Sequence, residues 1–334
     1  MDPRMAPLSS PQTESPKSEA TREFEYRTRC RVIRKIADGG MGSVYLGEQL
    51  GDAGFTKTVA LKVIKSDRLQ DGMALQMFLD EARLTADLVH TNIAQVHNLG
   101  MYKGRYFIVM EYLHAKTLSE YLAHFLRIDR LPPTDISAFI ISRVARGLHY
   151  AHTKRDRFGK PLNIVHRDVT PSNVMIDFRG AVKLTDFGIA KALKMPKPDE
   201  KRVIMGKYPY MAPEQAAART TDARTDIFAL GLVLYEQLTG TRVYTPRTRR
   251  TLIEQMTKYK IKDPRKIVPD LPDELVEINM KALEKDPDQR WQSAREFGDR
   301  LESFMYSKGY GPTNEKLADH VKELWPHVDV DKFE

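Results

Sequence analysis

Two acidic residues and an amide lie in short polar segments, each beside an apolar run. Asp168 and Asn173 are five residues apart in the segment 166–173. Asp186 lies in a second segment, 184–188. Carboxylate and amide oxygens are hard ligands of the kind that Mg²⁺ prefers, and a carboxylate beside them can accept a proton from a hydroxyl group. This spacing predicts Mg²⁺-assisted phosphoryl transfer.

A lysine and a glutamate are expected on faces that point inward. Lys62 lies in an alternating strand and shares its face with Ala60 and Ile64, while Glu81 falls on the apolar stripe of a helix over 72–88. A charge on a buried face needs an opposite charge, so the two side chains are natural partners. The alternative is two unrelated side chains that reach solvent separately. The presence of the other motifs in the same chain makes this alternative less favoured.

A glycine-rich segment, 37–44, lies between two strand-like runs. Glycines at such a hairpin let backbone N–H groups approach phosphate oxygens without obstruction by side chains. Taken alone, the segment indicates only a turn. Together with Lys62 and Asp168 it favours a site for a nucleotide phosphate.

The pattern of the chain changes near its middle. The first part reads as an antiparallel sheet interrupted by one helix, and long helical patterns dominate from Thr134 onward. A β-rich portion followed by an α-rich portion implies an α+β protein with two lobes. The expected strands cover 30–36, 44–48, 58–64 and 106–110, and the expected helices cover 72–88, 136–152 and 225–238.

Composition limits the class of protein. The chain has 334 residues, of which 41% are hydrophobic and 29% charged, and this balance predicts a packed globule. Residues 1–24 are rich in Pro, Ser, Thr, Glu and Lys, and we expect them to be disordered. No apolar run approaches the length of about 20 residues that a membrane span requires. The single cysteine, Cys30, excludes an internal disulfide and suits a cytoplasmic location.

The formal net charge of +8 is concentrated in one segment. Residues 241–266 hold nine Lys or Arg against two acidic residues, so they carry almost all of the excess. A local patch of this kind disfavours nucleic acid as a partner. It is either a solvated face or a docking surface for an acidic partner or protein substrate.

The ordered motifs resemble those of the eukaryotic-like (Hanks-type) serine/threonine protein kinases of bacteria. The resemblance rests on Gly39-Gly40-Met41-Gly42, on the segments 166–173 and 184–188, and on Met211-Ala212-Pro213-Glu214-Gln215. It implies the bilobal protein kinase fold, with ATP and Mg²⁺ as cofactors and serine or threonine of protein substrates as acceptors. It covers residues 30–306, and the domain is expected at 25–306 (lobes 25–111 and 112–306), with a helical extension at 307–334.

The resemblance also implies a role for each residue of the motifs. Lys62 would bind the α- and β-phosphates and pair with Glu81, Asp168 would accept the proton of the attacking hydroxyl, and Asn173 and Asp186 would hold Mg²⁺. Structural roles would fall to the ion pair Glu214–Arg290 and to Asp226, which would tie a helix to the catalytic loop. The nucleotide would contact a further set of residues: Ala37, Gly39, Gly40, Gly42, Val44, Ala60, Met110, Glu111, Tyr112, Leu113 and Met175.

Three positions depart from the family pattern. Ala37 replaces the first glycine of the phosphate loop, which is tolerable if its φ stays negative. Thr170 stands where the family usually has a lysine near the γ-phosphate, and Lys207 stands where it usually has threonine. We hypothesise that Lys207 supplies the ammonium group missing at position 170, which makes it a candidate catalytic residue.

The segment between Asp186 and Glu214 contains no serine or threonine. Arg167 would ordinarily meet a phosphorylated residue there, so we predict activity that does not depend on such phosphorylation. The main alternative to an active kinase is a pseudokinase that binds ATP or a partner. Against it, Lys62, Glu81 and Asp168 are all present together with both metal-binding positions.

Overall fold

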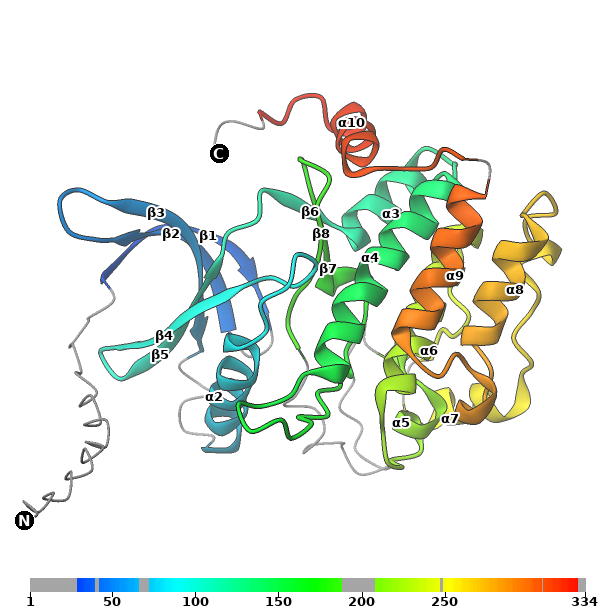
Figure 1. Ribbon diagram of the computed structural model, residues 1–334, viewed down its shortest axis with the longest axis horizontal. Coiled ribbons are helices and arrows are strands. Elements are labelled where there is room, and N and C mark those ends of the chain that lie inside the picture. The colour runs from blue at the N-terminus through cyan, green and yellow to red at the C-terminus, as the bar shows by residue number, and fades with distance from the viewer. Residues whose placement is uncertain are drawn as a thin grey trace, which may run out of the picture.

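The computed structural model describes residues 29–39, 42–65, 72–187, 208–246, 249–307 and 309–329. Two lobes are visible in Figure 1: an antiparallel sheet with one long helix, and a larger helical body. This is the predicted fold class. Residues 1–24, which we expect to be disordered, lie outside the described residues.

The small lobe is built on a five-stranded sheet in the order β1-β2-β3-β5-β4. Each face of the sheet has its own small core: Val59, Leu61 and Val109 on one side, and Ile64 and Ile108 with residues of helix α2 on the other. Strand β3 lies at the centre and is buried on both faces, so it can hold a side chain rigidly. The elements are β1 Arg29–Asp38, β2 Gly42–Leu50, β3 Thr56–Ile64, α2 Gly72–Ala86, β4 Val96–Tyr102 and β5 Arg105–Glu111.

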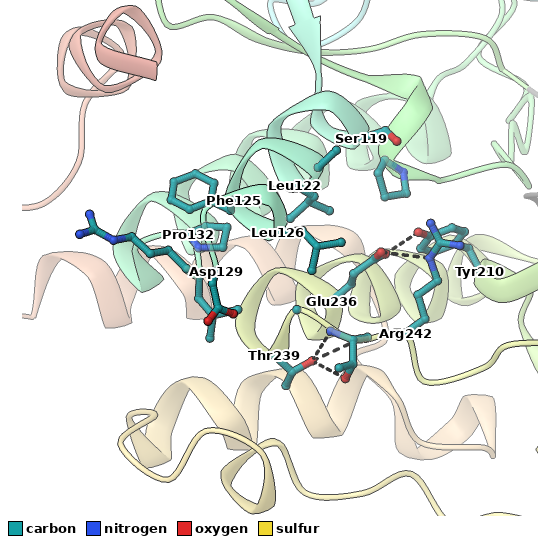
Figure 2. A pocket seen from close by; sticks show the side chains of 16 residues that line it. Ser119, Leu122, Phe125, Leu126, Asp129, Pro132, Tyr210, Glu236, Thr239 and Arg242 are labelled. Atoms are coloured by element: carbon teal, nitrogen blue, oxygen red, sulfur yellow. Dashed lines mark hydrogen bonds and ion pairs between the residues drawn. The ribbon is translucent and has the colours of Figure 1, made fainter. Parts of the chain in front are cut away.

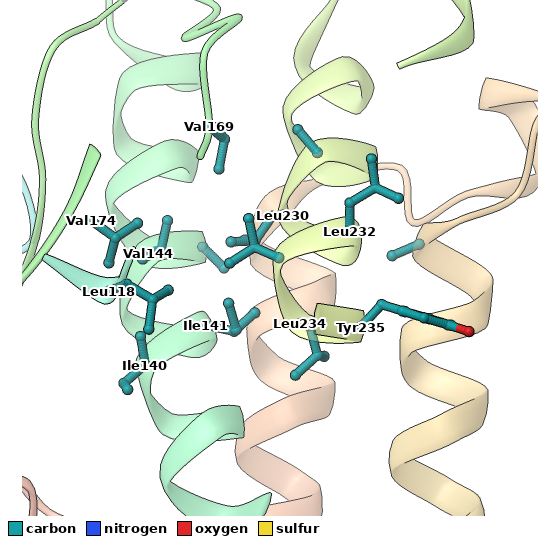
Figure 3. Close-up of a cluster of buried hydrophobic side chains, with 14 of the residues drawn as sticks. Leu118, Ile140, Ile141, Val144, Val169, Val174, Leu230, Leu232, Leu234 and Tyr235 are labelled. Atoms are coloured by element: carbon teal, nitrogen blue, oxygen red, sulfur yellow. The ribbon is translucent and has the colours of Figure 1, made fainter. Parts of the chain in front are cut away.

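The large lobe packs around helix α6, which is apolar on nearly every face and is buried on nearly every face. Asp222 caps its first turn, and Gly240 ends it with φ 67°. Figure 3 shows apolar side chains of α3, α4 and α6 meeting in one cluster. The helices are α3 Leu118–Arg127, α4 Thr134–Thr153, α5 Pro213–Ala216, α6 Ala223–Thr239, α7 Arg249–Lys258, α8 Asp273–Ala282, α9 Ala294–Tyr306 and α10 Asn314–Leu324.

A second, three-stranded sheet lies where the lobes join, in the order β6-β7-β8. Its strands are short: Ala115–Thr117, Val174–Asp177 and Val182–Leu184. The sequence did not predict these three strands, because three or four residues are too few for an alternating pattern to stand out. Strand β4 was also missed, since Asn98 and Gly100 interrupt its apolar pattern.

The predicted elements are otherwise present, with ends shifted by a few residues. Among the described residues, no helix combines the length and the apolar character needed to cross a bilayer.

Helix α10 packs on the large lobe beside α3 and the β6–β8 sheet (Figure 1). Leu317, Val321 and Trp325 belong to the main core, and the Tyr121 hydroxyl lies 3.0 Å from Nε2 of His320. The apolar face of this segment therefore packs on the large lobe. At the start of α10, the carbonyl oxygen of Asn314 lies against the backbone of Gly180.

Gly180 and Gly159 separate the cost of backbone strain from that of a steric clash. Both have φ +81°, but a Cβ at Gly180 would lie 1.8 Å from the Asn314 oxygen, whereas nothing lies within 4 Å of one at Gly159. We expect Gly159→Ala to lower the unfolding free energy by about 1 kcal/mol through the left-handed conformation alone. Gly180→Ala should cost at least about 2 kcal/mol more, since α10 must move away.

Urea unfolding of the two variants measures this difference, and hydrogen exchange of α10 locates it. Equal losses of stability in Gly159→Ala and Gly180→Ala would contradict the packing of α10 on this turn.

Candidate active site

The expected lysine–glutamate pair is present, and a third residue joins it. Nζ of Lys62 lies 2.7 Å from Oε1 of Glu81 and 2.7 Å from Oδ1 of Asp186. Lys62 comes from β3, Glu81 from α2 and Asp186 from the segment after β8, so one ammonium group joins the small lobe to the large lobe. Lys62 is 8% exposed and Glu81 7%, so water screens this pair only weakly, whereas the side chain of Asp186 is 46% exposed.

The charge of Lys62 is stable in this setting. Burial by itself would lower the pKa of Lys62, but the carboxylates of Asp186 and Glu81 outweigh burial and hold that pKa above its ordinary value. Lys62 therefore remains a cation throughout the physiological pH range. A fixed buried cation with two anionic partners can exchange one of them for a phosphate group.

The loop 166–173, called the catalytic loop below, brings Asp168 and Asn173 together. Nδ2 of Asn173 donates to the backbone oxygen of Asp168 at 2.8 Å and to its Oδ2 at 3.1 Å. Both residues are largely buried. The amide thus fixes the direction of the Asp168 carboxylate, as a positioned general base requires.

This loop is also attached to the segment that carries Asp186. The backbone N–H of Thr185 donates to the oxygen of Asn173 at 2.9 Å, and Nε2 of His166 lies 3.0 Å from the oxygen of Thr185. Asp186 itself has φ 53°, a left-handed conformation that is uncommon for a residue with a side chain. The surrounding hydrogen bonds hold Asp186 in the conformation that reaches Lys62.

The buried carboxylate of Asp226 holds the catalytic loop through its backbone. It accepts the backbone N–H groups of His166 and Arg167, each at 2.7 Å, and lies 2.8 Å from Nε2 of His152. Burial would raise the pKa of Asp226, but the groups around it, His152 foremost, hold it below its ordinary value. Asp226 thus ties α6 to the catalytic loop, the role that the resemblance implied.

Two further residues, Gln215 and Thr221, fix the loop through contacts that the sequence did not predict. Nε2 of Gln215 donates to the backbone oxygen of Arg167 at 3.0 Å, and Nε of Arg167 donates to Oγ1 of Thr221 at 3.0 Å. These partners are 48 and 54 residues apart along the chain. No local pattern connects residues at such distances, so only the fold reveals them.

The residues expected around the adenine lie on neighbouring strands. The β-ladders place Val44 opposite Lys62 and Ala60 opposite Met110, and they place Met175 in β7. The Glu111 carboxylate accepts hydrogen bonds from Lys183 Nζ at 3.0 Å and from the backbone N–H of Gln95 at 3.2 Å. Glu111 and Leu113 belong to the chain that connects the lobes, and both are half-buried.

The glycine-rich turn is described on both sides of its tip. Ala37 pairs with Val44, and Gly39 N–H donates to the Gly42 oxygen at 2.9 Å. A Cβ at Gly42 would lie 2.7 Å from the backbone oxygen of Val63, so a larger residue would displace the hairpin. Ala37 is not among the described residues with positive φ, as its methyl group requires. Gly40 and Lys207 lie outside the described residues.

The donor set suits Mg²⁺ bound together with a nucleotide. Asn173 and Asp186 offer amide and carboxylate oxygens on two segments joined by the hydrogen bonds of Thr185. Within the described ranges, no cluster of three or more His, Cys, Asp or Glu side chains is built to hold a metal. Mg²⁺ commonly uses one or two protein carboxylates and completes its shell with phosphates and water, and these residues fit that pattern.

The model of the protein kinase domain matches residues 30–299. The chain belongs to the protein kinase family. It is 41% identical over 274 residues to the tyrosine-protein kinase MasK of Myxococcus xanthus, covering 82% of this chain and 42% of that protein. It is 32% identical to the serine/threonine-protein kinase PrkC of Bacillus subtilis, covering 80% of this chain and 39% of that protein.

The fold is similar to that of solved protein kinase structures. The kinase domain of PknI from Mycobacterium tuberculosis aligns with a TM-score of 0.59 at 28% identity, covering 81% of this chain and 94% of that one. The predicted family and fold class are therefore confirmed. The chain spans about two fifths of the length of the first curated kinases it matches.

A buried ion pair joins the end of the activation segment (residues 186–214) to the rest of the large lobe. This pair also makes the stability of the protein depend on pH. The two oxygens of Glu214 accept from Arg290 at 2.9 Å each. Burial would raise the pKa of Glu214, but Arg290 outweighs it and holds the pKa below its unfolded value. The contribution of Glu214 to stability is thus complete above the unfolded pKa and is lost as the pH falls through the folded pKa.

We expect Glu214→Gln to lower the unfolding free energy at pH 7 by about 3–5 kcal/mol, because it leaves a buried guanidinium without its charge partner. The loss should shrink as the pH falls below about 4.5, where Glu214 of the unfolded chain becomes protonated. Glu254→Gln, which breaks an exposed pair with Arg250, is the control and should cost under about 1 kcal/mol. Urea unfolding at pH 7, 5 and 4 measures all three proteins; similar losses in both variants would contradict the account.

Proposed function

We propose that this protein is an active protein kinase that transfers the γ-phosphoryl group of ATP to serine or threonine hydroxyls of protein substrates, including its own. The observation that carries the proposal is the joint presence of two hydrogen-bonded clusters. Lys62, Glu81 and Asp186 form the first, and Asp168 and Asn173 form the second. Thr185 connects them through its hydrogen bonds to Asn173.

Each residue has a role that its surroundings support. Lys62 holds the α- and β-phosphates, and Glu81 keeps its ammonium group in place. Asp168, whose carboxylate is directed by the amide of Asn173, accepts the proton of the attacking hydroxyl. Asn173 and Asp186 hold Mg²⁺, which neutralises the charge on the phosphate oxygens when it is bound.

Two other functions are less well supported. A pseudokinase has no need for a buried lysine pair, a positioned base and two metal-binding residues at once, and all of these are present. A small-molecule kinase has no need for an activation segment anchored to the large lobe. Here that segment ends in Ala212-Pro213-Glu214, and Glu214 is held by Arg290.

Of the relatives named above, MasK is a tyrosine-protein kinase and PrkC is a serine/threonine-protein kinase, so measurement of the acceptor hydroxyl distinguishes the two classes. We favour serine and threonine because Thr170-Pro171-Ser172 and Tyr210-Met211 resemble the pattern of that class. Independence from phosphorylation of the activation segment is supported by the contact of Arg167 with Thr221, which gives this guanidinium a partner within the large lobe.

The direct test is incubation of the full chain with radiolabelled ATP and Mg²⁺ and a generic protein substrate, followed by phosphoamino-acid analysis. We expect label on serine and threonine that persists after phosphatase pretreatment and falls by at least about 10²-fold in Asp186→Asn, which loses a metal ligand. Label on tyrosine alone would reassign the acceptor. Absence of label, with ATP still bound, would favour the pseudokinase.

Lys207 is proposed to replace the lysine that the family carries at position 170. Thr170 is buried within the catalytic loop, and its backbone oxygen accepts from Asn173 N–H at 3.0 Å. Because a cation near the γ-phosphate lowers the barrier to transfer, we expect Lys207→Thr to reduce kcat by about 10-fold to 10³-fold. Thr170→Lys alone should also impair activity, and the double variant should recover part of it.

Steady-state kinetics of the three proteins decides this point, with thermal unfolding as the check on folding. Full activity of Lys207→Thr would remove Lys207 from the catalytic residues.

Protein substrates are expected to dock in part on the basic segment 241–266. Lys258, Lys260, Lys262 and Lys266 are exposed there, whereas Arg265 is paired with Asp263 and Asp273. An acidic partner fits the exposed lysines, and nucleic acid is not proposed. The domain limits 25–306 and 307–334 stay predictions, as does a cytoplasmic location, which rests on the single cysteine.

A further inference from the structure

A cavity of about 420 Å³ opens on the large lobe beside the catalytic loop. Helix α3 and the turn after it form one wall, and the end of α6 with residues 240–242 forms the other (Figure 2). Pro171 of the catalytic loop and Tyr210 of the activation segment line its inner end. None of the roles assigned above to ATP, Mg²⁺ or the catalytic residues uses this space.

The α3 wall of the cavity is mostly apolar and partly open to solvent, with Ser119, Asp129 and Arg130 as its polar residues. Leu126 is 72% exposed and Leu131 is 37% exposed, so part of this apolar surface is open to solvent. The remaining apolar lining is Leu122, Ala123, Phe125, Pro132 and Pro171. Burying such a wall under another apolar side chain is favourable, at about 25 cal/mol per Å².

The opposite wall is polar, but its charges already satisfy one another. One oxygen of the Glu236 carboxylate accepts from the Tyr210 hydroxyl, and the other accepts from Nε of Arg242 at 3.0 Å. The Arg242 guanidinium also lies 5.7 Å from the centre of the Tyr210 ring. A cationic substrate side chain would therefore have to displace Arg242 to reach Glu236, whereas an apolar one leaves these interactions intact.

The cavity lies close to the reacting group. Pro171 comes three residues after Asp168, and each residue spans at most about 3.6 Å, so their α-carbons are within about 11 Å. An extended peptide advances about 3.3 Å per residue. A peptide whose hydroxyl reaches Asp168 can therefore bring a residue about three positions away to the region of Pro171, which lines the cavity.

We infer that this cavity binds a large apolar side chain, such as leucine or phenylalanine, of the protein substrate, about three residues from the phosphorylated hydroxyl. The inference rests on the proposed kinase function and gives that function a substrate class. Selection comes from the apolar side chains of the α3 wall, while the pairing of Arg242 with Glu236 occupies the carboxylate that a lysine or arginine would otherwise reach.

The first test compares peptides that carry leucine, serine or lysine at each position within five residues of one acceptor serine. We expect wild type to prefer leucine over serine and lysine at one position by about tenfold in kcat/KM, the discrimination typical of an apolar pocket. Ala123→Trp fills the cavity from an exposed position of α3, and Leu126→Ser removes part of its wall. Both should abolish the preference and leave kcat/KM for the serine peptide unchanged.

Ile128→Ser is the matched control, because Ile128 is 46% exposed on the same turn but does not line the cavity. It should keep the leucine preference. Thermal unfolding shows that each variant is folded. Equal use of leucine and serine peptides by wild type, or an unaltered preference in Ala123→Trp, would overturn the inference while leaving the kinase function intact.

The second test reverses the charge argument. Arg242→Ala frees the Glu236 carboxylate, so the variant should gain at least about fivefold in kcat/KM for the lysine peptide relative to wild type. Arg250→Ala removes the same charge from an exposed pair on α7 and should gain nothing. A wild type that already prefers lysine at this position would overturn the inference.

Peptide binding measured by fluorescence anisotropy separates the two proposals, because it needs no phosphoryl transfer. Tighter binding of the leucine peptide, lost in Ala123→Trp, would keep the pocket even if no transfer occurred and the kinase function failed. Equal affinity for the leucine and serine peptides would overturn the pocket whatever the outcome of the transfer assay.

Discussion

The ammonium group of Lys62 imposes the strictest constraint on this structure. A buried charge is strongly destabilising unless it is paired and hydrogen-bonded, and the partners must come from wherever the fold can supply them. Here they come from α2 and from the segment after β8, each at 2.7 Å. The small-lobe sheet, the placement of α2 and the course of the chain around Asp186 all have to agree for this cluster to form.

The large lobe solves a related problem with a buried anion. Asp226 is surrounded by the apolar side chains of α6 and still accepts hydrogen bonds from two successive backbone N–H groups of the catalytic loop. Arg167 adopts φ 61°, a conformation in which consecutive N–H groups can converge on one anion. Helix α6, which is buried on nearly every face, thereby helps to fix the backbone of the loop that carries Asp168.

The residues of the site could largely be predicted from the sequence because each lies within a short motif whose residue types suit phosphate or metal. Lys62 and Glu81 could even be paired, since strand and helix periodicity put both on inward faces. The contacts of Gln215 and Thr221 with Arg167 could not be predicted, because they join residues about fifty positions apart. The cavity between α3 and α6 was likewise beyond the sequence: its walls come from four separate segments, and their meeting depends on helix packing. Short strands such as β6 were missed for want of enough residues to form a pattern.

The central claim is that Lys62, Asp186 and Asn173 form a site for ATP bound with Mg²⁺. Calorimetric titration of the full chain with ATP, with and without Mg²⁺, tests it most directly. The account predicts that Mg²⁺ tightens ATP binding by at least about tenfold in wild type, or about 1.4 kcal/mol, and has little effect in Asp186→Asn. Equal ATP affinity with and without Mg²⁺ in wild type would contradict it.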